Sequence, residues 1–416
     1  MIYFYRHKNK YLFSLKKYDG FEAITEEKAK SNNEEMYFLN EMDPLLSRRS
    51  FLVTNPSLLF MEKEGIELLL LNSKDYSRQL PNWILEKIKN KLVIAVNIAY
   101  PKWEEVLQNN FNNKWTINLV ALGDVGSTLL IGLRLLGGKY IDRIGIYDRN
   151  ENRLNRWEQE LNQIISPSNS EYFPPVVPIS KEELFNCHMF VFCASKGVPP
   201  VNSTIDDVRM VQYQANREII RDYAIMSRNE GFKGIFAVVS DPVDLLCKAA
   251  FLESNIGENG NFDFMGLASN QIIGYGLGVM HGRACYHSQK SKATSHYIKE
   301  GRVFGPHGKG LIVADSIENY NESLSEYLTI KTLNSNMDIR NLGYKPYVAP
   351  SLSSGTLSII ATINGDWFYG STYMGGAYMG SRVRLINGQL EIEQLNLHKT
   401  LFEKIKSTHE RLVNML

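Results

Sequence analysis

The segment of residues 116–148 constrains the fold of this chain more than any other. It begins with an apolar strand, Ile117–Leu122, passes through a turn that holds Gly123 and Gly126, and returns through a helix to a second apolar strand, Ile144–Tyr147. Strands that alternate with helices in this way predict a parallel sheet with crossover helices. The segment is therefore predicted to open an α/β domain.

The same alternation continues further along the chain. Apolar strands are predicted at Met189–Cys193 and Gly234–Val239, with a helical run at Arg209–Arg228 between them. Residues 115–272 are therefore predicted to form a doubly wound parallel sheet of the Rossmann type. Beyond them the pattern changes to long helices and antiparallel strands, and residues 273–416 are predicted to form a C-terminal α+β substrate domain.

Residues 1–114 carry a different pattern and are predicted to form a separate small α+β domain of unknown role. The predicted strands are Tyr3–Tyr5, Tyr11–Leu15, Phe51–Phe60, Leu68–Leu71 and Leu92–Ile98, and the predicted helical pieces are Pro81–Ile88 and Trp103–Leu107. The Asn-rich stretch Asn109–Lys114 is typical of a linker. A chain of 416 residues is long for one hydrophobic core, which agrees with several domains.

Composition excludes several classes of protein. Forty-six basic residues nearly balance 45 acidic ones, so the overall charge gives no reason to expect a nucleic-acid partner. The N-terminus reaches Arg6 too soon to hold the apolar core of a secretory signal. The most apolar long stretch, Ile117–Gly138, carries Asp124 and Arg134, which is a poor fit to a membrane span. Four cysteines without a CxxC pair fit a reducing compartment. We expect a cytoplasmic protein without a membrane partner.

The turn at residues 121–126 has the spacing of a dinucleotide-binding motif. Glycines in such a turn let the backbone approach a pyrophosphate, and the next helix points its N–H groups at the phosphates. Here Ala121 replaces the first glycine, whereas Gly123 and Gly126 remain. Asp148 ends the next strand, 22 residues after Gly126 (148 − 126 = 22), where an acidic side chain accepts bonds from the ribose hydroxyls of NAD and repels a 2′-phosphate. NAD is therefore the predicted cofactor.

Beyond the turn, a series of ordered segments resembles the NAD-dependent lactate/malate dehydrogenase family. The segments are Gly123–Thr128, Phe190–Ser195, Arg209–Asn216, Val238–Asp244, Ile273–Gly276 running to Arg283, and Gly305–Gly308. Their order carries the resemblance more than any single motif. The resemblance implies a homo-oligomer, a dimer or tetramer, and these cofactor-binding residues: Gly123, Asp124, Val125, Gly126, Asp148, Ala194, Asn216 and Val239.

The resemblance also implies the residues that handle the substrate. In that family a histidine of a Gly-x-His-Gly turn exchanges the proton at C2 of a 2-hydroxy acid while a hydride moves between C2 and nicotinamide, and His307 matches it. Arg283 matches the arginine that grips the substrate carboxylate with its planar guanidinium. Arg209 matches the mobile-loop arginine that polarises the substrate carbonyl. Lys345 falls about where the family has a pocket threonine and is a candidate for substrate binding.

This chain departs from the family at two positions that take part in the family's reaction. The family places an aspartate three residues before the carboxylate-binding arginine, where it stabilises the histidine, and this chain has Met280 there. Where the family usually has an asparagine that donates to the substrate oxygen, this chain has Asp241, whose ionised carboxylate cannot donate. Asp241 is a surrogate partner for His307, or it faces an amine-bearing substrate group, or proton transfer has been lost.

Three functions follow from these alternatives. The first is an NAD-dependent oxidoreductase acting on a small 2-hydroxy or 2-oxo acid, with no dicarboxylate indicated because the loop after Ala194 lacks the malate-type arginine. The second is a tailoring oxidoreductase for a larger, peptide-linked or amine-bearing substrate. The third is a catalytically impaired dinucleotide-binding or interaction protein, against which the retention of His307 and both arginines argues. No metal site is expected.

Overall fold

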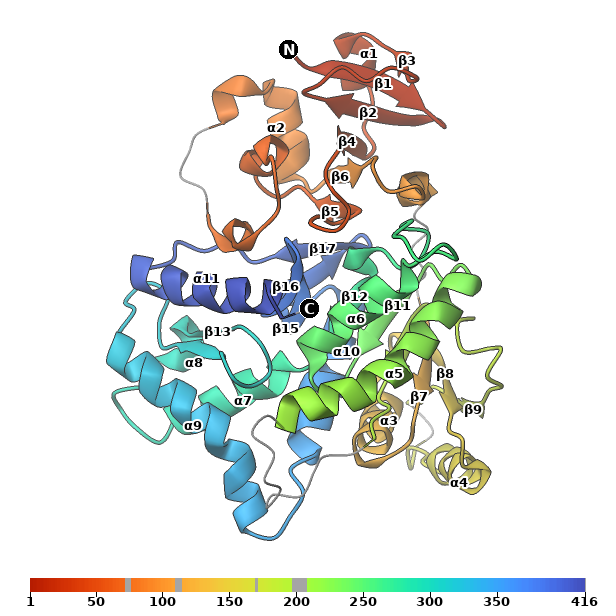
Figure 1. The fold of residues 1–416 in the computed structure, drawn as a ribbon, viewed down its shortest axis with the longest axis vertical. Coiled ribbons are helices and arrows are strands. Elements are labelled where there is room, and N and C mark those ends of the chain that lie inside the picture. Colours follow the sequence, from red (N-terminus) through yellow and green to blue (C-terminus); the bar gives the residue numbers. More distant parts are fainter. Residues whose placement is uncertain (72–75, 109–113, 169–170, 197–207, 416) are drawn as a thin grey trace.

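Two large sheets organise the computed structural model, one built from residues 3–97 and one from residue 115 onward (Figure 1). The structure describes residues 1–71, 76–108, 114–168, 171–196 and 208–415, without the side chains of residues 77, 208 and 209. The predicted linker, apart from Lys114, and most of the loop after Ala194 lie outside the described residues.

The N-terminal sheet has six strands in the order β3-β1-β2-β4-β6-β5. The elements are β1 (Tyr3–His7), β2 (Lys10–Ser14), β3 (Glu22–Ala23), α1 (Glu26–Lys30), β4 (Met36–Asn40), β5 (Ser50–Leu52), α2 (Asn82–Lys89) and β6 (Val93–Asn97). Strands β2, β4 and β6 run parallel, and the outer pairs are antiparallel. One face packs on α1 and α2 through Phe13, Phe38 and Ile84, and the other face carries its own cluster around Leu12 and Tyr37.

Parts of this N-terminal region differ from the sequence prediction. Of the predicted strand Phe51–Phe60, only its start belongs to β5, because Pro56 begins a short 3-10 helix, η1 (Pro56–Phe60), which the Asn55 side chain caps. Half of the predicted strand Leu68–Leu71 lies in another 3-10 helix, η2 (Ile66–Leu69), and Leu70 forms an isolated β-bridge with Leu395. The central strand β4 was not predicted, because its apolar run of four residues shows no decisive period.

The second sheet has nine strands in the order β17-β16-β15-β12-β11-β10-β7-β8-β9. Its strands are β7 (Trp115–Val120), β8 (Ile141–Tyr147), β9 (Val176–Pro178), β10 (Met189–Phe192), β11 (Ile235–Val238), β12 (Ile272–Gly274), β15 (Phe368–Met374), β16 (Ala377–Ile386) and β17 (Gln389–Ile392). The stretch from β9 to β12 is parallel. The connecting helices are α3 (Asp124–Leu136), α4 (Glu151–Asn162), α5 (Val208–Asn229) and α6 (Val243–Ser254). This is the predicted doubly wound arrangement, with the strand order reversing between β7 and β10.

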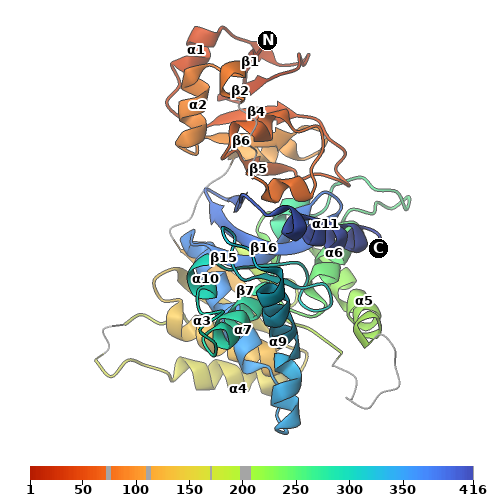
Figure 2. The ribbon, with the colours of Figure 1, turned by 90° about the vertical axis from the view of Figure 1, so that its left-hand side faces the viewer.

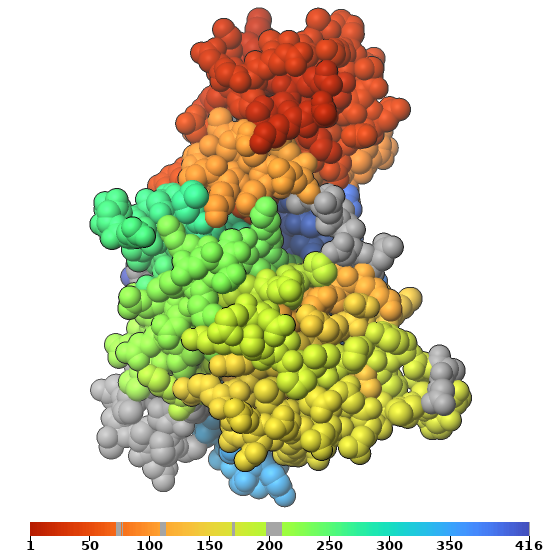
Figure 3. Space-filling model, turned by 90° about the vertical axis from the view of Figure 1, so that its right-hand side faces the viewer, coloured from red at the N-terminus to blue at the C-terminus, as the bar shows by residue number. Residues whose placement is uncertain are grey.

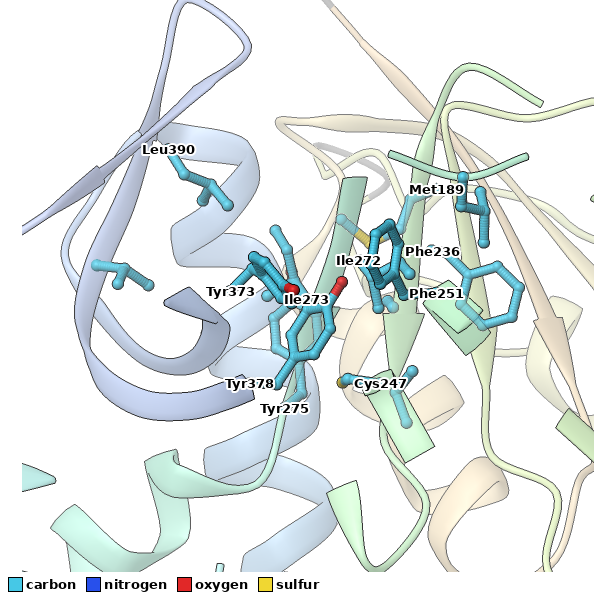
Figure 4. Packing of buried hydrophobic residues seen from close by; sticks show 14 of the residues in the cluster. Met189, Phe236, Cys247, Phe251, Ile272, Ile273, Tyr275, Tyr373, Tyr378 and Leu390 are labelled. Carbon is cyan, nitrogen blue, oxygen red and sulfur yellow. The ribbon is translucent and has the colours of Figure 1, made fainter. Parts of the chain in front are cut away.

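The C-terminal residues extend this sheet and do not form a sheet apart from it. Strand β15 pairs antiparallel with β12 at Ser371 and Gly274. Figure 4 shows Tyr373 and Tyr378, from β15 and β16, packed in the core with Phe251. The other elements are α7 (Leu277–Ser288), α8 (Tyr297–Glu300), the hairpin β13 (Arg302–Phe304) and β14 (Ile312–Ala314), α9 (Glu322–Asn341), a π-helical turn (Pro350–Leu357) continuing into α10 (Ser358–Asn364), and α11 (Lys399–Val413).

The N-terminal region packs on the edge of the second sheet where its parallel strands begin (Figures 2 and 3). The Arg49 guanidinium donates to Gln271, just before β12, and the Tyr100 hydroxyl lies 3.3 Å from the Ser269 hydroxyl. The Lys233 ammonium, just before β11, lies 3.5 Å from a Glu105 carboxylate oxygen. These contacts place the N-terminal region at the amino ends of the strands, opposite the edge where a doubly wound sheet binds ligands.

Candidate active site

The carboxyl ends of β7, β10 and β11 meet at one edge of the second sheet. Gly123, Ala194 and Val239 follow these three strands closely, and each is exposed or half-buried. The strand order reverses between β7 and β10, which is where doubly wound sheets bind nucleotides. The predicted cofactor residues on these loops are therefore brought together at one edge.

The turn at the start of α3 keeps the backbone geometry that glycines give a dinucleotide site. Ala121 adopts φ 72°, a left-handed conformation that the glycine it replaces would adopt without strain. A Cβ on Gly126 would lie 2.0 Å from the Ala121 carbonyl oxygen, so only glycine lets α3 pack this close to β7. A Cβ on Gly123 would meet nothing within 4 Å. The turn is thus tight on its protein side and open at Gly123, where a phosphate would approach.

Asp148 holds the turn against β8. Its Oδ2 accepts a hydrogen bond from the Leu122 N–H at 2.8 Å, its Oδ1 accepts one from the Asn150 N–H at 2.9 Å, and Arg153 donates to it at 3.4 Å. The side chain is only 8% exposed. A carboxylate offers about four acceptor positions, so one position is left for a ribose hydroxyl.

Lys345 lies at the turn that opens α3. Its ammonium is 3.0 Å from Oδ2 of Asp124, the first residue of α3, and both side chains are exposed. In this structure the lysine pairs with the negative charge of Asp124, and its contact with the substrate stays a prediction. Half-buried Val125, next along α3, completes the predicted turn.

Asn216 has a different role from the predicted cofactor contact. Its side chain is fully buried on α5. It donates to the Asp241 carbonyl at 2.8 Å and accepts from the Lys196 N–H at 2.9 Å, so it clamps the loop after β10 to the loop after β11. Asn216 thus positions Asp241, and its buried side chain offers no surface for the predicted contact with the cofactor.

His307 lies in the turn between β13 and β14 and pairs with Asp241. The His307 Nδ1 is 2.8 Å from Oδ1 of Asp241, and the two side chains are 10% and 43% exposed. Gly305 and Gly308 carry φ values of 93° and 137°, which L side chains rarely adopt. An ionised carboxylate only accepts hydrogen bonds, so Nδ1 carries the proton of this contact and Nε2 is the nitrogen suited to proton exchange with a substrate.

Two residues that sequence reasoning missed fix the position of His307. Oδ2 of buried Asp244 accepts a hydrogen bond from the His307 N–H at 3.1 Å. The Ser371 hydroxyl, on β15, donates to the other oxygen of Asp244 at 2.7 Å. Asp244 belongs to the segment Val238–Asp244, which carries part of the family resemblance, and it stands three residues after Asp241. That spacing is the sequence signal by which Asp244 could have been found. Ser371 gave no signal in the sequence.

Arg283 lies on α7 as a buried cation with neutral hydrogen-bond partners. It donates to the Met280 sulfur at 3.6 Å and to the Asn336 side-chain oxygen. Burial lowers the pKa of Arg283, and the negative charge of nearby Asp241 opposes that shift. Among the described residues, no carboxylate lies within salt-bridge distance of the guanidinium. Since a buried charge is costly unless paired, this site favours binding of an anion.

Sequence comparison identifies proteins with the same framework. The chain is 23% identical to an L-lactate dehydrogenase of Macrococcus caseolyticus over 323 residues, covering 71% of this chain and 94% of that protein. It is 25% identical to an L-lactate dehydrogenase of Corynebacterium glutamicum over 195 residues, covering 46% and 55%. The chain is a divergent relative of the lactate/malate dehydrogenase family. Models of known families give no match.

Solved structures of the family share the fold. A lactate dehydrogenase from a deep-sea metagenome library, MGS-M5, has a TM-score of 0.58 at 17% identity and covers 72% of this chain and 97% of its own. A malate dehydrogenase of Archaeoglobus fulgidus in complex with NADH has the same TM-score and identity, covering 71% and 97%. Both dehydrogenases are matched over almost their whole length, whereas more than a quarter of this chain is not matched. This chain is therefore long enough to hold the additional N-terminal sheet.

One family position lies outside what the structure describes. Arg209 is the second residue of α5, and nothing is described of its side chain or of residues 197–207 before it. Its role as the carbonyl-polarising arginine stays a prediction. Among the other residues predicted to handle the substrate, His307, Asp241 and Arg283 are described, and Asp241 interacts with both of the others.

Proposed function

We propose that this chain is an NAD-dependent oxidoreductase that transfers a hydride between nicotinamide and C2 of a 2-hydroxy or 2-oxo acid. The observation that carries the proposal is the His307–Asp241 pair beside the buried cation Arg283. It supplies a proton-exchanging group and an anion-binding group, as a 2-hydroxy acid requires. The relatedness to lactate dehydrogenases supports the same reaction class, on a CH–OH or C=O group.

The residues at the edge of the second sheet fit NAD. The open position at Gly123 and the N–H groups at the start of α3 would hold the pyrophosphate, and Asp148 would accept from a ribose hydroxyl. The charge of Asp148 favours NAD over NADP, because a 2′-phosphate would be repelled. When bound, the cofactor accepts or donates the hydride.

The chain's own residues divide the remaining work. In the oxidation direction, Nε2 of His307 takes the proton of the substrate hydroxyl, and Asp241 stabilises the imidazolium that forms. Arg283 binds the substrate carboxylate and orients C2. The 2.8 Å contact supports Asp241 as a surrogate for the aspartate that Met280 replaces, over the amine-binding alternative.

The test uses the full chain with NADH or NADPH and a series of 2-oxo acids, followed at the nicotinamide absorbance. We expect NADH to be oxidised with at least one 2-oxo acid and preferred over NADPH. Arg283→Lys loses the two-bond grip on the carboxylate, which costs about 1.5–3 kcal/mol in kcat/KM, while NADH affinity stays unchanged. The exposed Arg156 provides the control Arg156→Lys.

Three outcomes would contradict the proposal in different ways. NADH binding without turnover of any 2-oxo acid would favour the larger, peptide-linked substrate or the loss of catalysis. Absence of NADH binding would remove the dinucleotide site altogether. Equal loss of activity in Arg283→Lys and Arg156→Lys would place the carboxylate elsewhere.

A further inference from the structure

A cavity of about 110 Å³ lies beside the His307–Asp241 pair. Its walls include Pro306, which precedes His307, and Pro242, which follows Asp241. The opposite wall is α11, through Leu412. The cavity therefore adjoins the turn that carries His307 and the loop that carries Asp241, and the C-terminal helix contributes to its wall.

The inner wall of the cavity is almost entirely apolar. Pro242, Leu245, Pro306 and Leu412 are buried. Asp244 also lines it, but both carboxylate oxygens accept hydrogen bonds, one from the His307 N–H and one from the Ser371 hydroxyl. The interior thus favours a hydrocarbon group over a polar one.

The rim of the cavity is cationic and held in place. Lys309 and Arg411 line the cavity and are exposed. The Arg411 guanidinium donates to the Lys309 carbonyl at 3.0 Å, and the Lys248 ammonium, on α6, donates to the Val413 carbonyl at 3.0 Å. These bonds tie α11 to the His307 turn and to α6, so the far wall is fixed. Positive charge at the rim attracts anions such as 2-oxo acids.

We propose that this cavity is the subsite for the substrate's side chain, and that the substrate is a 2-oxo or 2-hydroxy acid with a branched apolar side chain. This rests on the proposed function. Apolar cavities of about 150 Å³ hold a benzene molecule, so one somewhat smaller accommodates a branched side chain of about four carbons. Pyruvate, whose side chain is one methyl group, would leave the cavity unfilled.

The first test narrows the cavity from its rim. Met415 lines it and is 41% exposed, so Met415→Trp reduces the volume with little risk to folding. Met337 on α9 is 42% exposed and lies outside the cavity, which makes Met337→Trp the matched control. With NADH, we expect Met415→Trp to raise KM for 4-methyl-2-oxopentanoate about tenfold more than KM for pyruvate. Met337→Trp should change neither.

A second variant and a binding measurement separate this proposal from the reaction itself. Leu245→Trp fills the inner wall and should discriminate against 4-methyl-2-oxopentanoate in the same way. Calorimetric titration with 4-methylpentanoate, which has no oxo group, should show binding to the parent that both tryptophan variants weaken about tenfold. This readout holds even if no 2-oxo acid is turned over.

The outcomes are distinct. Equal effects of Met415→Trp on the branched and the methyl substrate, or undiminished binding of 4-methylpentanoate to both variants, would overturn the subsite. Failure of the parent to turn over any 2-oxo acid would overturn the proposed function, and the titration would then decide the subsite alone. Lys309→Gln should weaken 4-methylpentanoate binding, whereas exposed Lys299, distant from the cavity lining, provides the control Lys299→Gln.

Discussion

His307 and Asp241 stand 66 residues apart in the chain, and Nδ1 of the first lies 2.8 Å from Oδ1 of the second. The carboxylate comes from the loop between β11 and α6, whereas the family's aspartate would come from α7, where Met280 stands. The Met280 sulfur instead accepts from the Arg283 guanidinium. The chain thus supplies a negative charge to its histidine from the loop after β11.

Asp241→Asn should lower activity although it restores the family residue. The imidazolium formed during the cycle would lose its nearby carboxylate, and we expect kcat/KM for a 2-oxo acid to fall about 100-fold at neutral pH. Adding Met280→Asp should recover part of the activity, because it places a carboxylate where the family has one. Unchanged kcat/KM in Asp241→Asn would remove Asp241 from catalysis.

Alanine substitutions of the two glycines in the turn before α3 should have different effects. Gly126→Ala should lower the stability of the protein, and Gly123→Ala should lower its affinity for NADH. Gly126→Ala forces a Cβ to 2.0 Å from the Ala121 carbonyl oxygen and should lower the free energy of unfolding by about 1–3 kcal/mol. Gly123→Ala places its Cβ in open space, so it should leave unfolding unchanged and weaken NADH binding about tenfold, or about 1.4 kcal/mol. Urea unfolding and NADH fluorescence titration measure both. Unchanged NADH affinity in Gly123→Ala would contradict the phosphate assignment.

Sequence reasoning placed the parts of this fold that follow a repeating local pattern. The alternation from Ile117 to Tyr147 fixes strands, helix and turn because each has its own period and the glycines mark the bend. It failed at β4, where four apolar residues fit strand or helix equally, and at η2, whose leucines are buried in a 3-10 turn. At both places, packing against the surrounding residues decides whether the chain forms a strand or a helical turn.

The site shows the same division between pattern and packing. Motif order located His307, Asp241 and Arg283, but it cannot give the direction of a side chain. Asn216 therefore stands at the predicted place on α5 with its amide turned into the protein, and Lys345 reaches across to Asp124. Ser371 was beyond reach, because its bond to Asp244 spans 127 residues and depends on β15 joining the sheet.

Arg48 and Glu64 form a buried ion pair within the N-terminal region, with Nε 2.8 Å from Oε2 and both side chains at most 3% exposed. Arg48→Met leaves the carboxylate buried without its partner and should cost about 3–5 kcal/mol of unfolding free energy. The double change with Glu64→Leu should recover most of it. The exposed pair of Arg156 and Glu160 provides the control, since Arg156→Met should cost at most about 1 kcal/mol. Equal costs of the two methionine variants in urea unfolding would contradict this prediction.

The exposed pair of Lys345 and Asp124 should tune cofactor affinity and contribute little to stability. Asp124 puts a negative charge on the first turn of α3, where it opposes a pyrophosphate, and the ammonium of Lys345 offsets that charge. Lys345→Gln should therefore weaken NADH binding about fivefold at an ionic strength of about 0.01 M, and the effect should fade at about 1 M as the charges are screened.

Asp124→Asn should tighten NADH binding by a similar factor, and the double variant should return close to the parent, because the two charges act on the phosphates in opposite directions. Fluorescence titration of NADH at both salt concentrations measures this cycle, with exposed Lys299→Gln as the control. If Lys345→Gln instead raised KM for 2-oxo acids while NADH affinity stayed constant, Lys345 would act on the substrate, as the family position implies. The ion pair with Asp124 would then be a resting contact that the lysine leaves when substrate binds.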